Sequence, residues 1–454
     1  MTGPMAEKTW KDYKEKRRSR PLPLKGIRVL EVGTLLLGPV GPGFAAMMGA
    51  EVIKCEIPPV GDTARNMTPF GYLFKEAFPP TFSHINVNKY WFGLDLHKPE
   101  GQKIFLELAA RSDVIQTNLR PGVMEKWNVG YHHVKEINPR IIYLSKTGFG
   151  QWGPYAEENR PSNDGAAQGL CGYAWMSSFP GQPPLKSGIY PCDDYGGLMG
   201  EVAVLAALHR RDRTGEGQFI DLAQTENIMR LMSWVWPYQQ ITGKTAMPSG
   251  NRDVSICPAD TFYCGDGAFL ALAAPAPAEF KGLCAAIGKP ELAEDPRFKD
   301  HLTRLKEENA TAILKIIAGW ARTKSAGEIE ALAEKHGFAA ARVKTARDVI
   351  EDKHSQERGY ISEIDDPLLG RYRDGGFPVM MSKTPPRVKW GVRPVGFDNE
   401  YVLTHHLGKT EDEIKQLYGC GAVGKWADIR GRKPPSDWDG KSGLIMARKE
   451  GGME

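Results

Sequence analysis

The chain has 454 residues, of which 41% are hydrophobic and 25% are charged, and this ordinary usage excludes a fibrous or wholly disordered protein. Its length predicts two or three domains or subdomains. The formal net charge of +4 suits a small anionic ligand and is far below the basic excess of a nucleic-acid-binding protein, so we expect no nucleic-acid partner.

Strands alternate with helices over residues 24–150. The apolar runs 27–33 and 50–56 have strand length and flank a helix of small residues, which predicts a β-α-β unit with two parallel strands. Residues 92–118 repeat this pattern, and residues 138–150 contain a further strand. The alternation predicts a doubly wound α/β sheet.

The first strand-to-helix connection does not bind a dinucleotide. Its sequence at residues 38–43 is GPVGPG and not GxGxxG, and Pro39 and Pro42 lack the backbone donors that a phosphate cradle would use. We therefore exclude NAD as a ligand of this connection.

The second half of the chain has a different order of predicted elements. A long helix is predicted from Tyr195 to about His209, and another helix ends near Trp236. Residues 237–257 resemble a linker because of their glycines and proline. After a hairpin-like segment come helices rich in Lys, Glu and Ala, at residues 278–287, 302–320 and 325–336. Near the C-terminus, Thr410 with Glu413 three residues later predicts a capped helix.

The cysteines and termini bear on the compartment. The seven cysteines contain no Cys-x-x-Cys pair, so we expect reduced thiols and no metal site. No apolar run reaches the roughly 18 residues of a membrane span, and the N-terminus lacks the apolar core of a secretory signal. The sequence therefore predicts a cytoplasmic protein without a membrane segment. The dense basic run at residues 14–20 is typical of a solvated arm.

Separated motifs keep a common order and approximate spacing from residue 24 to about residue 420. They are LKGIRVLEVG…GP (24–39), GAEVIKCE (49–56), GDTAR (61–65), NVNKYWFGLDLHKPEG (86–101), SDVIQTNLRPGVMEKWNVGY (112–131), INPRIIYLSKTGFGQWGP (137–154), PSNDGAAQGLCG (161–172), GIYPCDD (188–194), RTGEGQFIDLAQTE (213–226) and GNRDVSICP (250–258). Together they resemble the family III CoA-transferases, the group with the formyl-CoA:oxalate and carnitine CoA-transferases.

The resemblance implies a Rossmann-like large domain built from both ends of the chain, a smaller α+β domain, and two chains interlocked like rings. The partner would be an identical chain or a related chain in a hetero-oligomer. The predicted parts are an N-terminal arm (1–23), a large α/β CoA-binding domain (24–236), a linker (237–257), a small α+β domain (258–380), a return segment to the large domain (381–423) and a C-terminal tail (424–454).

Two adjacent carboxylates, Asp193 and Asp194, precede a glycine-rich apolar run. Judged by local sequence alone, helix capping is the more frequent role of such a pair. The resemblance implies that Asp193 attacks the acyl-CoA carbonyl and forms first a mixed anhydride and then an aspartyl-CoA thioester, while Asp194 has a capping or electrostatic role. We expect the helix N-terminus to keep Asp193 ionised, and amides near Tyr195 and Gly196 to hold an oxyanion.

Asp164 stands where the resemblance places an acidic residue near the site. It either orients the acceptor acid or the glycine-rich loop, or it caps the helix that follows it, and the sequence leaves both roles open. The related 2-methylacyl-CoA racemases carry a histidine directly before this aspartate. Here the preceding residue is Asn163, whose amide does not accept a proton at useful pH. A racemase or isomerase therefore ranks second, with a partner subunit of a hetero-oligomeric transferase as another alternative.

CoA is expected as a substrate thioester and not as a permanently bound cofactor. By resemblance, the candidate contacts are Asn118, Leu119 and Lys126, then His97 and Lys98 near the adenosine 3′-phosphate, with Arg65 and Lys89 as further possibilities. Lysine suits a phosphate as a point charge, although Lys98 and Lys126 can equally be solvated charges on a helix face.

Some positions depart from the family pattern. Thr34 and Leu36 stand where relatives often have polar or basic side chains, and Tyr90 replaces a common arginine. A more apolar entrance favours a bulky acid, so we expect succinyl-CoA as donor and an aromatic dicarboxylate such as benzylsuccinate as acceptor. Candidate lining residues are aromatic, although such side chains more often belong to the core: Tyr173, Trp175, Trp234 and Trp236.

Overall fold

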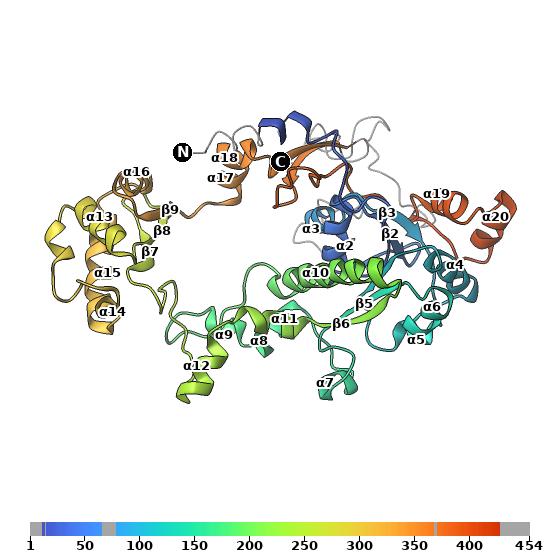
Figure 1. Cartoon of the computed structure of the whole chain (residues 1–454), viewed down its shortest axis with the longest axis horizontal. Coiled ribbons are helices and arrows are strands. Elements are labelled where there is room, and N and C mark those ends of the chain that lie inside the picture. Colours follow the sequence, from blue (N-terminus) through green and yellow to red (C-terminus); the bar gives the residue numbers. More distant parts are fainter. Residues whose placement is uncertain (1–10, 14, 66–78, 367–369, 427–454) are drawn as a thin grey trace. The chain divides into compact units, whose positions relative to one another are not determined.

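The computed structural model describes residues 11–13, 15–65, 79–366 and 370–426 (Figure 1). The chain divides into two compact units. The first comprises Met1–Tyr173, Ser187–Ser233 and Lys353–Glu454, and the second comprises Ala174–Lys186 and Trp234–Asp352. The chain thus leaves and re-enters the first unit, which places residues 353–380 there and not with the small domain expected from the sequence.

The first unit is built on a parallel sheet. Among the described residues, six strands lie in the order β3-β2-β1-β4-β5-β6. Their bounds are β1 (Arg28–Val32), β2 (Glu51–Glu56), β3 (Tyr90–Gly93), β4 (Val114–Thr117), β5 (Ile142–Thr147) and β6 (Gln218–Ala223), and all neighbours are parallel. The predicted α/β class is confirmed, and the order is that of a doubly wound nucleotide-binding fold, which reverses between β1 and β4.

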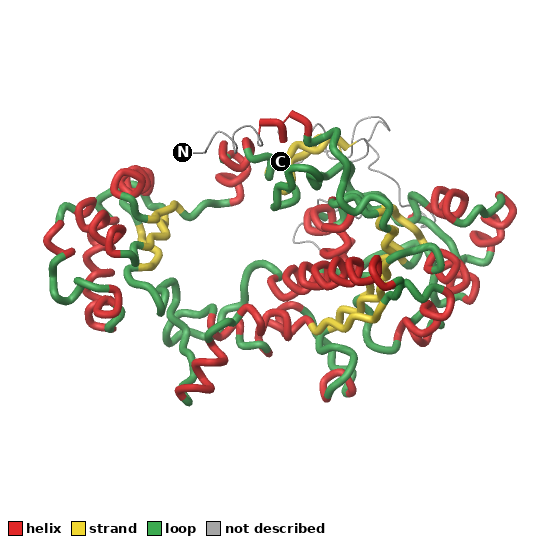
Figure 2. The backbone as a smooth tube through the Cα atoms, in the orientation of Figure 1, coloured by secondary structure: helices red, strands yellow, loops and turns green. Residues whose placement is uncertain are grey.

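Helices cover both faces of this sheet (Figure 2). The helices of the first unit are α2 (Leu37–Met47), α3 (Pro80–Ile85), α4 (Pro99–Ala109), α5 (Val123–Lys126), α6 (Tyr131–Ile137), α7 (Pro154–Glu157), α8 (Asp164–Leu170), α10 (Pro191–Thr214), α11 (Gln224–Leu231), α18 (Lys353–Glu357), α19 (Asn399–Tyr401) and α20 (Glu411–Gly419), with α9 (Tyr173–Met176) at the unit boundary. A 3₁₀ turn (Thr63–Arg65), a π-helix (Val402–His406) and an antiparallel pair, β10 (Ile361–Asp366) and β11 (Gly370–Gly375), complete the unit.

Each strand contributes alternate residues to two apolar clusters. Val29 and Val52 pack with α2 and α10, whereas Leu30 and Ile53 pack with α4 and the C-terminal π-helix. Burial on both faces explains why the strands appear in the sequence as continuous apolar runs. The α20 helix has the predicted capping box of Thr410 and Glu413.

Helices α2 and α10 touch closely because glycines replace larger side chains at their crossing. A Cβ atom added to Gly197 would lie 2.6 Å from the Cβ of Val40, and one added to Gly196 would lie 2.7 Å from Leu37. This contact fixes the first turns of α10 against the connection between β1 and α2.

Three buried lysine side chains hold the connection between β1 and α2 by hydrogen bonds to its backbone carbonyls. Lys54 donates to the carbonyl of Gly33 (2.8 Å), Lys146 to that of Gly38 (2.6 Å) and Lys89 to that of Pro39 (2.9 Å). All three lysines have no exposed surface.

A buried carboxylate balances two of these charges. Glu31 on β1 lies 2.7 Å from the Nζ atoms of both Lys54 and Lys89. Burial opposes ionisation of Glu31, but the two ammonium groups outweigh it and lower its pKa to about 2. Burial lowers the pKa of Lys89 to about 8 and that of Lys146 to about 7.

The second unit is an α+β body with its own apolar core. In its described part, an antiparallel sheet has the order β7-β8-β9. Its elements are α12 (Val235–Thr242), β7 (Ala259–Tyr263), β8 (Phe269–Ala273), α13 (Pro277–Ile287), a 3₁₀ turn (Pro290–Ala293), α14 (His301–Arg304), α15 (Glu307–Ala321), α16 (Ala326–His336), β9 (Ala339–Arg342) and α17 (Ala346–Glu351).

Some predicted boundaries are wrong. The long helix begins at Pro191, four residues before the expected Tyr195, and therefore includes both aspartates. Helix α12 occupies the start of the predicted linker. The C-terminal tail (424–454) lies outside the described residues after 426. No described helix combines the length and apolarity needed to cross a bilayer.

Candidate active site

Asp193 lies in the first turn of α10 and is buried, with 8% of its surface exposed. Pro191 begins the helix, which is a favourable position because the first helical N–H needs no partner within the helix. The side-chain amide of Gln224, the first residue of α11, donates a 2.6 Å hydrogen bond to Oδ1 of Asp193. The carboxylate is therefore fixed by a residue 31 positions away.

Asp164 caps α10 and not the helix that follows it. Its Oδ2 accepts the backbone N–H of Cys192 (2.8 Å) and that of Asp193 (3.2 Å), and its Oδ1 accepts the amide of Gln168 (2.5 Å). Helix α8, which Asp164 begins, is capped by Asn163, whose side-chain oxygen accepts the N–H of Ala166 at 2.9 Å. Of the two roles that the sequence left open, capping of the following helix is wrong.

The expectation that the helix N-terminus keeps Asp193 fully ionised is also wrong. Burial, together with the charges of Asp164 and Asp194, raises its pKa to about 7, and the Gln224 hydrogen bond only partly offsets this increase. The physical reason is that Asp164, itself a carboxylate, occupies the first N–H groups of α10. Near neutral pH the Asp193 carboxyl is therefore present in both protonation states.

A histidine on another helix acts on Asp194. Burial and Asp164 raise the pKa of Asp194, and the charge of His84 lowers it. His84 lies on α3, and its Nδ1 is 2.7 Å from Oδ1 of Asp374 on β11, a hydrogen bond that raises the pKa of the imidazole. Its side chain is 52% exposed, so His84 is open to solvent and, when protonated, acts on Asp194.

Sequence reasoning missed both Gln224 and His84. Gln224 belongs to one of the recognised motifs and follows β6 directly, and this position at the carboxyl end of a parallel strand was a usable signal. His84 has no such signal, because its partner Asp374 is 290 residues away.

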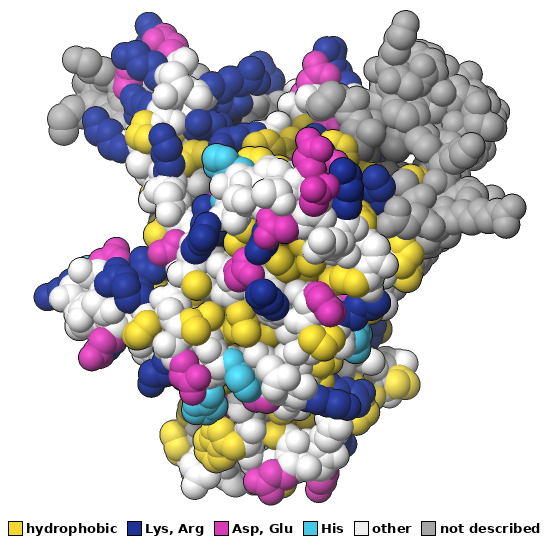
Figure 3. Space-filling view, turned by 90° about the vertical axis from the view of Figure 1, so that its right-hand side faces the viewer, with side chains coloured by type: hydrophobic (Ala, Val, Ile, Leu, Met, Phe, Trp, Pro, Cys, Tyr) yellow, Lys and Arg dark blue, Asp and Glu magenta, His cyan; other side chains and the backbone are white. Residues whose placement is uncertain are grey.

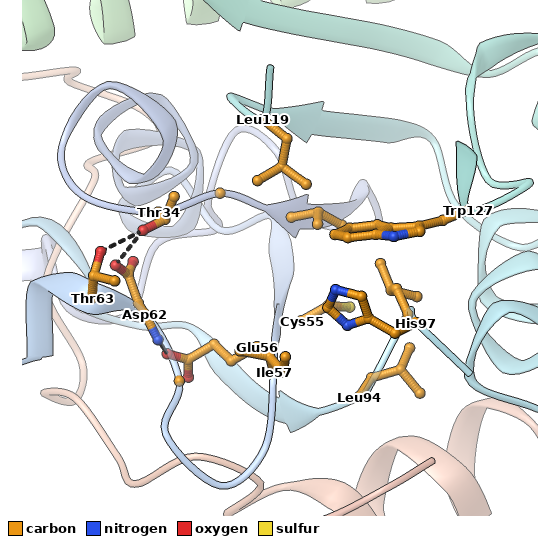
Figure 4. Close-up of a pocket in the computed structure, with 14 residues that line it drawn as sticks. Thr34, Cys55, Glu56, Ile57, Asp62, Thr63, Leu94, His97, Leu119 and Trp127 are labelled. Atoms are coloured by element: carbon orange, nitrogen blue, oxygen red, sulfur yellow. Dashed lines mark hydrogen bonds between the residues drawn. The ribbon is translucent and has the colours of Figure 1, made fainter. Parts of the chain in front are cut away.

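A cavity of about 210 Å³, called the strand-end cavity below, opens at the carboxyl ends of β1 to β4 (Figure 4). Its lining residues are Val32, Gly33, Thr34, Cys55, Glu56, Ile57, Gly61, Asp62, Thr63, Leu94, Leu96, His97, Leu119 and Trp127. Trp127, His97 and Leu94 form one wall, and the His97 and Trp127 rings meet edge to face with centroids 4.7 Å apart. Ligands of doubly wound sheets bind at this edge, where the strand order reverses.

The opposite wall is polar. Oδ1 of Asp62 accepts hydrogen bonds from the hydroxyl of Thr34 (2.8 Å) and the N–H of Leu35 (2.9 Å), and the Thr34 hydroxyl is 3.0 Å from that of Thr63. Asn118 does not line the cavity. Its side-chain amide pairs with both backbone groups of Thr34, at 2.8 and 2.9 Å, and so holds this wall in place.

Residues 24–399 match the model of CoA-transferase family III. This chain belongs to that family. It is 34% identical to a succinyl-CoA–D-citramalate CoA-transferase of Chloroflexus aurantiacus over 87% of this chain and 97% of the relative. A succinyl-CoA–L-malate CoA-transferase beta subunit of that organism is 32% identical, with the same shares covered. The solved structure of a CAIB/BAIF family protein from Brucella suis has a TM-score of 0.74 and 28% identity, covering 85% of this chain and 100% of that one.

The sequence resemblance is thus confirmed, and the chain is an acyl-CoA:carboxylate CoA-transferase of family III. Of the predicted CoA contacts, His97 and Leu119 line the cavity. Lys126 is exposed at the end of α5, and Lys98 is half-buried and donates to the carbonyl of Cys420 at 2.5 Å.

The structure contradicts the assignment of Arg65 and Lys89 to CoA. Arg65 is 1% exposed and donates to both carboxylate oxygens of Glu56, at 2.8 and 2.7 Å, and its guanidinium lies over the rings of Phe82 and Trp91. Lys89 is fully buried, as described above. Both side chains form ion pairs with buried glutamates of the fold. The presence of a basic residue in the sequence does not indicate such burial.

Of the two interpretations of the candidate aromatic residues, entrance lining or core, the structure excludes the core for three of them. Trp175, Trp234 and Trp236 are 40%, 42% and 46% exposed and are not core residues. Tyr173 is half-buried against the small cluster that contains Cys171 and Cys192.

Two substitutions should move the pH dependence of the reaction in opposite directions. Asp164→Asn removes a charge that raises the pKa of Asp193, so the acidic limb of the kcat/KM profile should move to lower pH. Gln224→Leu removes the donor that lowers this pKa, so the limb should move to higher pH. Since a hydrogen bond to a charged group contributes about 1.5–3 kcal/mol, Gln224→Leu should lower kcat/KM at pH 6 by roughly tenfold or more. Shifts of equal sign would contradict the described electrostatics.

Proposed function

We propose that this chain moves CoA from succinyl-CoA to a second carboxylic acid, with Asp193 as the covalent nucleophile. The observation that carries the proposal is a buried carboxylate, fixed by Gln224 at the start of α10, at the position that matches the nucleophile of the family. Succinyl-CoA is the donor in the names of both relatives described above, and this supports the same donor here.

The reaction needs no separate base. The ionised Asp193 oxygen attacks the thioester carbonyl, the C–S bond breaks, and CoA leaves as a thiolate from a mixed anhydride. The thiolate attacks the aspartyl carbonyl of the anhydride, which releases the donor acid as its carboxylate and leaves an aspartyl-CoA thioester. The acceptor carboxylate then reverses these steps and regenerates Asp193. Every proton is balanced, because each carboxylate consumed is matched by one released.

The surroundings of Asp193 suit these intermediates. The Gln224 hydrogen bond fixes Oδ1, and we assign the attack to Oδ2. Burial limits access of water, which would otherwise hydrolyse the anhydride. A carboxylate whose pKa is near 7 is a stronger nucleophile than an ordinary aspartate, since nucleophilicity increases with basicity, while a substantial fraction remains ionised.

Trapping tests the nucleophile directly. Incubation with succinyl-CoA followed by hydroxylamine or borohydride should modify the peptide that contains Asp193, as measured by mass spectrometry. Asp193→Ala should lower kcat by a factor on the order of 10⁴ or more, whereas Asp212→Asn, on an exposed position of the same helix, should retain activity. An unmodified Asp193 in an active enzyme would remove the proposal.

Two further measurements separate the alternatives. Exchange of the substrate α-proton with deuterated solvent, without an acceptor acid, would indicate a racemase. A purified chain that becomes active only with a related chain would indicate a partner subunit.

We also propose that the acceptor is a dicarboxylate. D-citramalate and L-malate, in the names of the relatives, carry two carboxylates, of which only one receives CoA. The second needs a cation, and His84, whose pKa is raised by its hydrogen bond to Asp374 and whose charge acts on Asp194, supplies one when it is protonated. Aromatic dicarboxylates such as benzylsuccinate should therefore be tested as acceptors together with aliphatic ones.

The apolar wall of the strand-end cavity, at His97 and Trp127, is assigned to the adenine of CoA.

This division of the substrates predicts a crossed result. His84→Gln should raise KM for dicarboxylate acceptors about tenfold, by loss of a charge-assisted contact, and leave KM unchanged for a donor acyl-CoA whose acyl group has no second carboxylate. Trp127→Ala should raise KM for acyl-CoA and leave KM for the acceptor unchanged. Each variant controls for the other in steady-state kinetics. Equal effects of His84→Gln on monocarboxylate and dicarboxylate acceptors would refute the role of His84.

The interlocked dimer implied by the family remains a proposal with its own support. Leu198 and Val202 of α10 are 40% and 56% exposed, one turn apart on an apolar stripe that a second chain can cover. Light scattering of the purified chain should give twice the mass of 50.3 kDa, and Val202→Glu should shift it towards a single chain. A stable monomer with full activity would refute the dimer.

A further inference from the structure

The basic run at residues 14–20 is not simply a solvated arm. Arg17 and Arg18 line a cavity of about 720 Å³ within the first unit, together with residues of the segments 354–365 and 376–389. A cavity of this volume is in the range of small-molecule sites. The cavity shares no lining residue with the strand-end cavity.

The lining is strongly basic. Arg17, Arg18, Arg358, Arg387 and Lys389 all border the cavity, and the ion pairs of the described residues join none of them to a carboxylate. The two acidic lining residues, Glu363 and Asp365, both pair with Arg371, at 3.2 and 3.5 Å. Figure 3 shows Lys and Arg side chains gathered along the upper edge of one face, the level at which the arm lies in Figure 1.

Arg387 joins the arm to the cavity through neutral acceptors. Its guanidinium donates to the carbonyls of Arg17 and Arg20 at 3.1 Å and to that of Pro385 at 3.3 Å. Burial lowers its pKa, and burial, Arg387 and Lys25 lower the pKa of Lys389. Positive charges therefore repel one another here, and a bound anion would relieve that repulsion.

Aromatic rings accompany these charges. Tyr13, Tyr360 and Phe377 also line the cavity, and Phe377 is held edge to face by Phe44 of α2, with centroids 5.5 Å apart. Guanidinium groups match phosphate oxygens in pairs, and flat apolar rings accept a nucleobase by stacking.

We propose that this cavity binds a phosphate-bearing anion of nucleotide size, at a site separate from that of the CoA substrate. Arg18 and Arg358, whose residues are exposed at the surface, provide the phosphate contacts that can be removed without disturbing the core. Arg387 holds the arm in place and frames the site.

Calorimetric titration of the full chain with inorganic tripolyphosphate and with ADP tests this site. We expect one ion per chain, with affinity that falls as salt rises from 50 to 150 mM by the usual screening of charges. The double variant Arg18→Ala/Arg358→Ala should bind at least tenfold more weakly and keep its transferase activity. The matched control Arg210→Ala/Arg213→Ala removes the same charge from the exposed end of α10 and should bind as the unaltered chain does.

Three results would overturn the proposal. They are the absence of binding to either probe, equal affinities in the double variant and its control, and competition by acyl-CoA together with a raised KM for acyl-CoA in the double variant. The last result would assign the cavity to the substrate itself. All three are independent of trapping at Asp193, so a failure here leaves the nucleophile assignment intact.

Discussion

The position of the β1–α2 connection depends on three buried lysine side chains that donate hydrogen bonds to its backbone carbonyls. Lys54, Lys89 and Lys146 are desolvated, and each is retained by hydrogen bonds to backbone oxygen and by neighbouring carboxylates or amides. Removing one partner of such a buried pair costs about 3–5 kcal/mol, because a charge is then left alone in a medium that solvates it poorly. The connection in turn carries the polar wall of the strand-end cavity and the contact of Leu37 with Gly196, so both candidate substrate regions share this support.

The sheet itself generates this layer of charge. In parallel register, Glu31 of β1 is opposite both Lys54 of β2 and Gln116 of β4, and alternation places all three on the face that carries α2 and α10. Gln116 continues the row to Lys146 and to Glu201, whose pKa is raised to about 7 by burial. Glu201 is two turns beyond Asp194 on α10, so the helix that bears Asp193 is anchored into the same network that holds the connection.

The doubly wound sheet could be predicted from the sequence, because strands buried on both faces leave continuous apolar runs. The position of Asp193 near the start of a helix could also be predicted, because each recognised motif is an unbroken run of residues. The residues that contact Asp193 could not be predicted from the sequence. Asp164 and Gln224 reach it from 29 and 31 residues away in the chain, and only packing decides that Asp164 caps a neighbouring helix and not its own. Arg65 and Lys89 were misassigned because a basic residue is usually solvated, and nothing local shows that these two are enclosed by Glu56 and Glu31.

With Asp193 as the proposed nucleophile, its protonation would make the transferase responsive to acid without any dedicated sensor. Burial and the neighbouring carboxylates raise its pKa to about 7, so the charge on this side chain changes across the neutral pH range. In the proposed mechanism this sensitivity to acid requires no effector and no change of shape, only the burial that raises the pKa of Asp193.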